Sequence, residues 1–390
     1  MSPRRKQIFL VVFFVGLVFG VPLSQSGLEI YQGGRPRLTG LITQAPTQAN
    51  LRAFERTLEE ASWLAGMLRP KMQSLMFHLF RDLGDKVVLG KDHWLFYKPD
   101  VQYLVEPLPM AGNRTPAEDD PLTTIIAFQK QLRARNIHLL VMPVPGKPSI
   151  YPEMLSTLLG PGKDAVVASN TLQLITQLKS AGVEVVDLFR FFHESKRATR
   201  SLREGDPYYL SQDTHWTGNA AEMAAHHVAR RLLDLGWVEP GSGEYNLRSV
   251  SVRRRSDIIR MVRIGSIEAY FPGDAVNLQQ VVEEATSRLY KDDSKSSVLI
   301  LGDSFLRIYQ TDEPRSAGFI AHLARALKQP LASIVNDGGA STLVRQELSR
   351  RAELLNDKRI VIWEFVERDI RFGMEGWKYV ALPSRAQPFG

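Results

Sequence analysis

Three residues in two distant segments have side chains suited to acyl transfer. Asp213 and His215 lie two positions apart in the segment DTHW, and Ser304 follows the apolar run VLIL in the segment GDSF. A serine becomes a nucleophile when an imidazole takes its proton and a carboxylate orients that imidazole. Residues two apart in an extended segment point to the same side, so Asp213 can reach His215. We therefore predict a triad of Ser304 as nucleophile, His215 as base and Asp213 as orienting acid.

Each half of this triad also has a plain structural interpretation. A serine after a strand commonly caps the next helix, and a histidine beside an aspartate commonly makes a surface hydrogen bond. The combination at two loops of one domain favours catalysis. We expect Asp303 to start a helix, because Asp213 already supplies the acid, and Gly302 to permit a tight turn.

The elements that must position these residues alternate along the chain. Short apolar runs, expected to be strands, occupy residues 137–144, 183–188, 298–301, 331–336 and 359–365. Several follow helical segments closed by Gly or Asn. This alternation predicts an α/β fold, a mainly parallel sheet with helices on both faces. Ligands of such sheets lie beyond the carboxyl ends of the strands, where Ser304 is expected. Thr217 is predicted to cap a helix that ends at Gly236.

Composition excludes several kinds of chemistry. The chain has 390 residues, a formal charge of +7 and no cysteine, so thiol catalysis, thiolate metal sites and disulfides are ruled out. No G-x-S-x-G elbow, zincin motif or phosphate loop occurs, and we expect no metal and no cofactor. The run Arg253–Arg255 is interpreted as a solvated charge run without interleaved aromatics, and nucleic acid is not expected as a partner.

The N-terminus predicts export. Arg4, Arg5 and Lys6 precede the apolar run 8–23, the pattern of a signal anchor with its basic end in the cytoplasm. A cleaved signal peptide is the alternative. Residues 32–50 are interpreted as a linker and 51–83 as a helical segment broken at Pro70. We predict an anchor over 1–25, a linker and leading helical segment over 26–84, and the catalytic domain over 85–390.

The two chemical segments are similar to those of a known class of enzymes. GDSF at 302–305 resembles the nucleophile block of SGNH-type hydrolases, and DTHW at 213–216 resembles their Asp/His block with one residue fewer. The order is permuted, because the Asp/His block precedes the serine. This order resembles the alginate-type polysaccharide O-acetyltransferases (AlgJ and AlgX type). Segments 87–100, 141–155, 338–348 and 360–370 resemble further blocks of that family, so the resemblance covers most of the chain.

The resemblance implies an SGNH-hydrolase-like fold with circularly permuted motifs and the same triad. An uncleaved anchor and the absence of a further module favour the AlgJ type. The backbone N–H of Ser304 is expected in the oxyanion hole. Further oxyanion or substrate candidates, each with packing or a plain turn as its alternative role, are Asn336, Gly338, Gly339, Lys147, Tyr151 and Trp216.

The implied reaction is ping-pong transfer of an acetyl group through Ser304 to an exopolysaccharide, most simply alginate, in the periplasm. Implied partners are a multipass inner-membrane protein that delivers the acetyl donor, an anionic polysaccharide acceptor, other polymer acetylation subunits, and the inner membrane itself. Two alternatives stay open: an acetylesterase with the same triad, and a non-catalytic membrane-anchored scaffold.

Overall fold

The structure is a computed structural model that describes residues 3–106, 119–156, 166–198, 207–262, 264 and 267–383. Contacts divide the chain into two units. The first comprises residues 1–84 with the short segment 263–267, and the second comprises 85–262 and 268–390. Asp213, His215 and Ser304 all belong to the second unit. The predicted boundary of the anchor at residue 25 stays a prediction.

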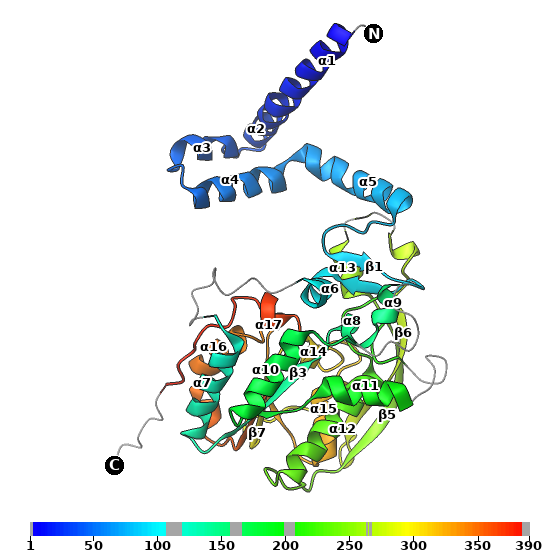
Figure 1. Cartoon of the computed structure of the whole chain (residues 1–390), viewed down its shortest axis with the longest axis vertical. Helices are drawn as coiled ribbons and strands as arrows, with labels where there is room; N and C mark the ends of the chain where they lie inside the picture. Colours follow the sequence, from blue (N-terminus) through cyan, green and yellow to red (C-terminus); the bar gives the residue numbers. More distant parts are fainter. Residues whose placement is uncertain are drawn as a thin grey trace. The chain divides into compact units, whose positions relative to one another are not determined.

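The first unit is helical (Figure 1). Its elements are α1 Pro3–Val15, a π-helical turn Gly16–Gly20, α2 Val21–Tyr31, a 3₁₀ turn Arg37–Thr39, α3 Gly40–Thr43, α4 Gln48–Ala61 and α5 Trp63–Phe80. The helix over Arg4–Tyr31 has 28 residues, and an 18-residue window of it has a mean hydropathy of 2.3 with no buried residue. It is therefore long and apolar enough to cross a membrane, as a signal sequence also would be. Part of the expected linker 32–50 is helical.

Two helices occupy the region 51–83, but the break lies elsewhere than predicted. Pro70 is inside α5 and does not end it. The interruption is at Ser62, whose extended backbone separates α4 from α5 and whose hydroxyl accepts from Ala65 N, which starts the new helix. Proline clashes with the carbonyl four residues earlier, which here belongs to Gly66, and this exposed helix tolerates it. A capping serine therefore set the boundary, not the proline.

The second unit is built on a five-stranded sheet with all neighbours parallel. The strand order is β4-β3-β9-β7-β8. The strands are β3 His138–Val144, β4 Glu184–Val185, β7 Val298–Gly302, β8 Ala332–Val335 and β9 Ile360–Val366. Each lies within one residue of a run predicted as a strand, or inside it. The predicted mainly parallel α/β sheet is confirmed.

Helices cover both faces of this sheet. The helices of the second unit are α6 Lys98–Val105, α7 Pro121–Arg133, α8 Lys147–Ile150, α9 Pro152–Leu155, α10 Ser169–Ser180, α11 Leu188–Ala198, α12 Gly218–Asp234, α13 Asp257–Met261, α14 Ser304–Arg307, α15 Phe319–Leu327, α16 Leu343–Arg350 and α17 Asp369–Phe372. Short 3₁₀ turns cover Ile267–Ala269 and Ala352–Leu355.

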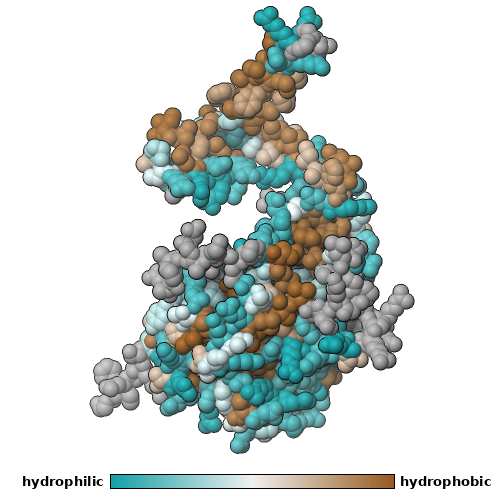
Figure 2. All heavy atoms as spheres, in the orientation of Figure 1, coloured by the Kyte–Doolittle hydropathy of each residue, from teal (hydrophilic) through white to brown (hydrophobic). Residues whose placement is uncertain are grey.

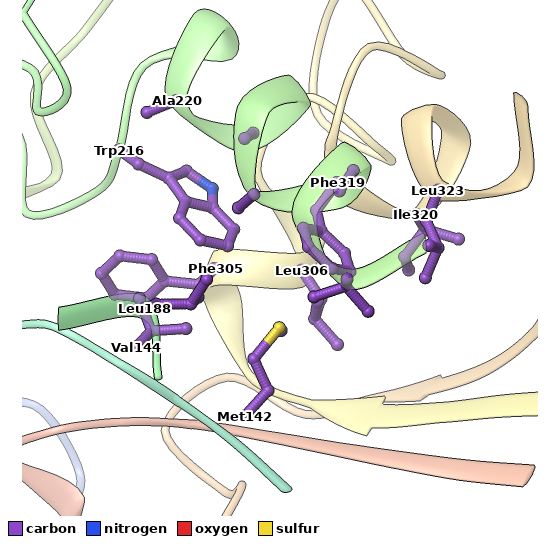
Figure 3. Packing of buried hydrophobic residues seen from close by; sticks show 14 of the residues in the cluster. Met142, Val144, Leu188, Trp216, Ala220, Phe305, Leu306, Phe319, Ile320 and Leu323 are labelled. Atoms are coloured by element: carbon purple, nitrogen blue, oxygen red, sulfur yellow. The ribbon is translucent and has the colours of Figure 1, made fainter. Parts of the chain in front are cut away.

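Two buried clusters form the core, because alternate strand residues point to opposite faces. On one face, Met142 and Val144 of β3 pack with α12 and α15 (Figure 3). On the other face, Leu139 and Val141 pack with α7, α10 and α16. The sheet is thus buried on both sides, as parallel sheets are.

Two antiparallel pairs complete the second unit. β1 Val87–Leu89 pairs with β2 Leu95–Tyr97, and β5 Tyr245–Arg254 pairs with β6 Asp274–Glu283 over ten residues. The β5–β6 pair was not predicted. Its polar alternation resembles an exposed loop in sequence, since most of β5 faces solvent.

Candidate active site

Ser304 lies at the carboxyl end of a buried strand. β7 ends at Gly302, and α14 begins at Ser304. The carboxylate of Asp303 accepts a hydrogen bond from Phe305 N at 2.9 Å and so caps α14. This confirms the prediction that Asp303 starts a helix. Because β7 is buried throughout, the serine is held on a rigid element.

A close contact with a buried side chain requires glycine at position 302, in addition to the tight turn expected from the sequence. Glu364, on the neighbouring strand β9, accepts a hydrogen bond from Asp303 N at 2.9 Å. A Cβ at Gly302 would lie 2.2 Å from the same carboxylate oxygen, Oε2. A buried carboxylate therefore approaches the backbone directly before the serine, and this approach requires glycine.

The segment that carries Asp213 and His215 is tied back on itself. Tyr209 and Trp216 form an antiparallel bridge, and Leu210 N donates to His215 O at 3.1 Å. The Thr217 hydroxyl caps α12 by accepting from Ala220 N, as predicted. The segment is thus closed by the bridge and leads directly into α12.

Trp216 fixes the same segment to the core. Its ring packs edge-on against Phe305, next to Ser304, with centroids 5.4 Å apart, and stacks on Phe319 at 5.7 Å (Figure 3). Trp216 is fully buried. The sequence proposed it as a substrate contact, and the structure places it in the packing that aligns the histidine with the serine.

The three residues predicted to react lie in one hydrogen-bonded row. His215 Nε2 is 2.8 Å from Ser304 Oγ, and His215 Nδ1 is 2.6 Å from Asp213 Oδ1. Asp213 and His215 are buried, whereas Ser304 is half-buried. This order of atoms is that of a nucleophile, a base and an orienting acid. The arrangement can accept the serine proton on His215 while Asp213 stabilises the resulting charge.

The second oxygen of Asp213 has two further donors. Arg254 Nε and Asp257 N each lie 3.1 Å from Oδ2. Burial alone would raise the pKa of Asp213, but the charge and hydrogen bond of His215 and the charge of Arg254 outweigh it and hold that pKa well below its usual range. The Asp213 carboxyl is therefore ionised in the folded protein near neutral pH.

Arg254 corrects the interpretation of the basic run. Arg253 and Arg255 are exposed, as expected for a solvated charge run. The side chain of Arg254 is only 10 % exposed and bonds Asp213, and it also pairs with Asp312 at 3.3 Å. Because alternate residues of a strand face opposite sides, the middle arginine turns inward at the end of β5.

Asp257 is a second carboxylate beside the histidine that the sequence did not reveal. Its Oδ2 lies 3.6 Å from His215 Nδ1, and the carboxylate accepts from Thr214 N at 2.9 Å and Thr214 Oγ1 at 2.5 Å. Burial and then the charge of Asp213 raise the pKa of Asp257. It is 42 residues from His215 (257 − 215), so no local pattern links the two.

Asp213, His215 and Asp257 are also the kind of group that can hold a metal ion, with ligand atoms within 4.8 Å of one another. The hydrogen bonds that these residues make favour a role in proton transfer over metal binding. Both imidazole nitrogens are engaged, by Asp213 and by Ser304. The guanidinium of Arg254 already neutralises Asp213, and a metal cation would have to compete with it.

Lys147 supports the loop from within the protein. Its Nζ donates to the carbonyls of Leu95, Ser211 and Asp213, the last two at 2.8 and 3.0 Å. Burial lowers the pKa of Lys147 to about 7, partly opposed by the charge of Asp274. The sequence left open whether Lys147 lines the cleft or packs beside it, and its contacts are those of packing.

Tyr151 and the turn at 336–339 also lie beside these segments. The Tyr151 hydroxyl accepts from Tyr208 N at 2.9 Å, which supports the strand-like entrance to the Asp/His segment. Asn336 N donates to Gly302 O at 3.0 Å, so the turn begins next to the serine strand. Within it, Gly338 has a φ of +66°, and Gly339 N donates to Asn336 O at 2.9 Å. Contacts of this turn with a reacting group stay a prediction.

A parallel α/β sheet, a strand-end serine and an upstream Asp/His loop together define an SGNH-hydrolase-like serine acyl-transfer fold. The family described as "SGNH hydrolase-like domain, acetyltransferase AlgX" matches residues 87–367. This match spans most of the chain, which therefore belongs to that acetyltransferase family.

Curated relatives carry descriptions that agree with this assignment. A "Probable alginate O-acetylase AlgJ" of Pseudomonas fluorescens is 26% identical over 305 residues, covering 76% of this chain and 71% of the relative. The protein of the same description from Pseudomonas putida is 23% identical, covering 94% and 90%.

Two solved structures share the fold. The "O-Acetyltransferase Domain of Pseudomonas putida AlgJ" aligns with a TM-score of 0.55 and 23% identity, over 73% of this chain and 92% of that one. Pseudomonas aeruginosa AlgX aligns with a TM-score of 0.51 and 18% identity, over 72% and 61%. The predicted SGNH-like fold and family are confirmed.

Proposed function

We propose that this chain is a polysaccharide O-acetyltransferase that carries the acetyl group on Ser304. The observation that supports it most directly is the row of contacts from Ser304 Oγ to His215 Nε2 at 2.8 Å and from His215 Nδ1 to Asp213 at 2.6 Å. Alginate is the proposed acceptor, because the curated relatives are named alginate O-acetylases.

The first half-reaction forms the acetyl-enzyme. Ser304 Oγ attacks the carbonyl carbon of the acetyl donor while its proton passes to His215 Nε2. Asp213 stabilises the charged imidazole. The tetrahedral intermediate collapses, the donor's leaving group takes the proton from His215, and acetyl-Ser304 remains. The N–H of Ser304 is the proposed oxyanion donor, since amides in the first turn of a helix lack helical partners.

The second half-reaction transfers the acetyl group. A sugar hydroxyl attacks the acetyl carbonyl and gives its proton to His215, and Ser304 Oγ leaves and recovers that proton. The product is an O-acetyl sugar and free enzyme. Only the identity of the attacking hydroxyl separates transfer from hydrolysis, because water would give acetate by the same steps.

The proposed setting is the periplasmic side of the inner membrane, with the helix Arg4–Tyr31 as anchor. A multipass inner-membrane partner would supply the acetyl donor, and other acetylation subunits would work beside it. The acceptor is an anionic polysaccharide, for which a protein of formal charge +7 has a weak electrostatic preference.

The test is to trap and chase the acyl-enzyme. We expect mass analysis after exposure to an acetyl ester to show one acetyl group on the Ser304 peptide, and none in Ser304→Ala. Ser251→Ala, an exposed serine on β5, is the control that should acetylate normally. A chase with oligomannuronate should give acetylated sugar. Free acetate as the only product with every acceptor would identify an esterase, and polymer acetylation that persists in Ser304→Ala cells would identify a scaffold.

A further inference from the structure

Helix α5, Trp63–Phe80, exposes apolar side chains along its whole length. Of its 18 residues only Phe77 is buried. One stripe recurs at spacings of four, four, three and four residues, which places its members on one face. The stripe consists of Leu64, Leu68, Met72, Leu75 and Leu79.

The stripe is too exposed to be an ordinary soluble surface. Met72 is 58% exposed and Leu79 63%, and Leu68 and Leu75 are close to half exposed. Figure 2 shows hydrophobic surface over α5 and over the N-terminal helix of the same unit. Contiguous exposed apolar surface of this kind marks a contact with a membrane or a partner.

The start of α5 is fixed to the membrane-crossing candidate just beyond its most apolar part. Trp63 N donates to Gln25 Oε1, and Trp63 Nε1 donates to Ser24 Oγ, both at 3.1 Å. Ser24 and Gln25 directly follow the apolar run that ends at Leu23. If the run lies in the bilayer core, Trp63 is at the level where hydrocarbon gives way to headgroups, the depth at which tryptophan is enriched.

The charges of α5 match a lipid surface. The helix contains Arg69 and Lys71 and no acidic residue, and Arg81 follows it. Arg69 pairs with Glu59 of α4 at 2.5 Å, so Lys71 and Arg81 are the cations that would meet headgroups. Helices that lie in the membrane interface combine an apolar face with basic residues that meet anionic headgroups.

We propose that α5 is an interfacial helix, which lies on the outer leaflet of the same membrane that the N-terminal helix crosses and buries the Leu64–Leu79 stripe among the lipids. This proposal depends on the membrane anchoring included in the proposed function. It adds a second attachment, one that would restrain the path of the chain between the anchor and the catalytic unit.

The test uses the cysteine-free sequence. Single cysteines are introduced as Met72→Cys and Leu75→Cys on the stripe, and as Gln73→Cys and Ser74→Cys off it. The full chain is spin-labelled and reconstituted in vesicles of phosphatidylethanolamine and phosphatidylglycerol. Collision rates with oxygen, which concentrates in lipid, are compared with those of a water-soluble nickel chelate.

We expect the oxygen-to-nickel ratio to be several-fold higher at 72 and 75 than at 73 and 74. Equal ratios at all four positions would overturn the proposal. Shielding of 72 and 75 from both reagents would also overturn it, because protein would then cover the stripe.

Val12→Cys, inside the apolar run, separates this proposal from its premise. Lipid exposure at Val12 without exposure at 72 and 75 rejects the interfacial helix and leaves the anchor and the proposed enzyme intact. Water exposure at Val12 rejects both the anchor and the interfacial helix, while the acetyl-Ser304 experiment is unaffected.

Discussion

The guanidinium of Arg254 bonds the oxygen of Asp213 that faces away from His215, at 3.1 Å. Asp213 is therefore held from both ends, by the imidazole on Oδ1 and by the arginine on Oδ2. The ring of Tyr309 lies beneath the guanidinium at 5.6 Å and keeps it in place. A carboxylate in this setting cannot rotate away from the histidine without losing a charged hydrogen bond.

Replacing Arg254 with methionine should slow catalysis without unfolding the protein. A hydrogen bond between charged groups contributes about 1.5 to 3 kcal/mol, so we expect kcat/KM to fall about tenfold to a hundredfold. The measurement is hydrolysis of a small acetyl ester, which avoids effects on polymer binding. Arg253→Met and Arg255→Met remove the same charge from exposed neighbours and should keep near-normal rates. Equal losses in all three variants would show a general charge effect.

Gly302→Ala should destabilise the catalytic unit. The added Cβ would lie 2.2 Å from Glu364 Oε2 and 2.5 Å from Leu306 Cδ1, and both are buried. Overpacking of this kind costs about 1 to 3 kcal/mol. Gly146→Ala is the matched control, because its Cβ would meet carboxylate oxygens of Asp100 and Glu367 at 3.5 Å, an ordinary contact. Urea unfolding should separate the two variants, and an unchanged midpoint for Gly302→Ala would contradict the packing argument.

The strands and the grouping of Asp213 with His215 could be predicted because their signals are local. Apolar runs of strand length, the two-residue spacing of Asp213 and His215, and the cap at Thr217 each lie within a few positions. Segments separated by 89 residues, as His215 and Ser304 are, still fall at one edge of the sheet, because parallel strands bring their carboxyl ends together.

The surroundings of the triad could not be predicted, since they depend on distant pairings. Arg254 differs from its two neighbours only through the register of β5. Glu364 is an acid inside a buried strand. The reason for an acid at this position is the neighbouring Asp303 N, which donates a hydrogen bond to it. At Pro70 a strong local signal gave a wrong prediction. The helix continues through Pro70, and the boundary lies at the serine cap eight residues earlier.

Buried Glu367 should make the protein less stable as pH rises from about 4.5 to 7. Burial raises the pKa of Glu367 from 4.5 to about 7, despite hydrogen bonds from Ser149 and Gly146. Between those values the folded protein holds a proton that the unfolded chain has lost, so the free energy of unfolding falls with pH, by about 1.4 kcal/mol per unit while one full proton differs.

Glu367→Gln should remove this slope while keeping a side chain that can bond the same neighbours. The measurement is the free energy of urea unfolding at pH 5 and at pH 7 in the variant and the unchanged protein. Glu353→Gln, at an exposed position, should leave the slope as it is. A slope unaffected by Glu367→Gln would place the proton elsewhere.

Lys147→Met should disrupt both stability and catalysis. The change leaves the carbonyls of Leu95 and Asp213 without this donor, while Ser211 O keeps its bond from Leu95 N at 2.8 Å. A buried acceptor left unpaired costs about 1 to 3 kcal/mol, so we expect a loss on the order of 3 kcal/mol and a displaced Asp213 loop. Lys130→Met, on the exposed side of α7, is the control. Lys147→Met should lower both the midpoint of thermal unfolding and the rate of ester hydrolysis. Lys130→Met should change neither quantity.

The pH dependence gives Lys147 a second test, with a sign opposite to that of Glu367. Burial lowers the pKa of Lys147 from 10.5 to about 7. Between these values the unfolded chain binds the proton that the folded protein has released, so this group makes the free energy of unfolding rise with pH. Lys147→Met should abolish that rise between pH 7 and 9, measured against Lys130→Met. An identical rise in both variants would mean that Lys147 keeps its proton in the fold, held by the three carbonyls.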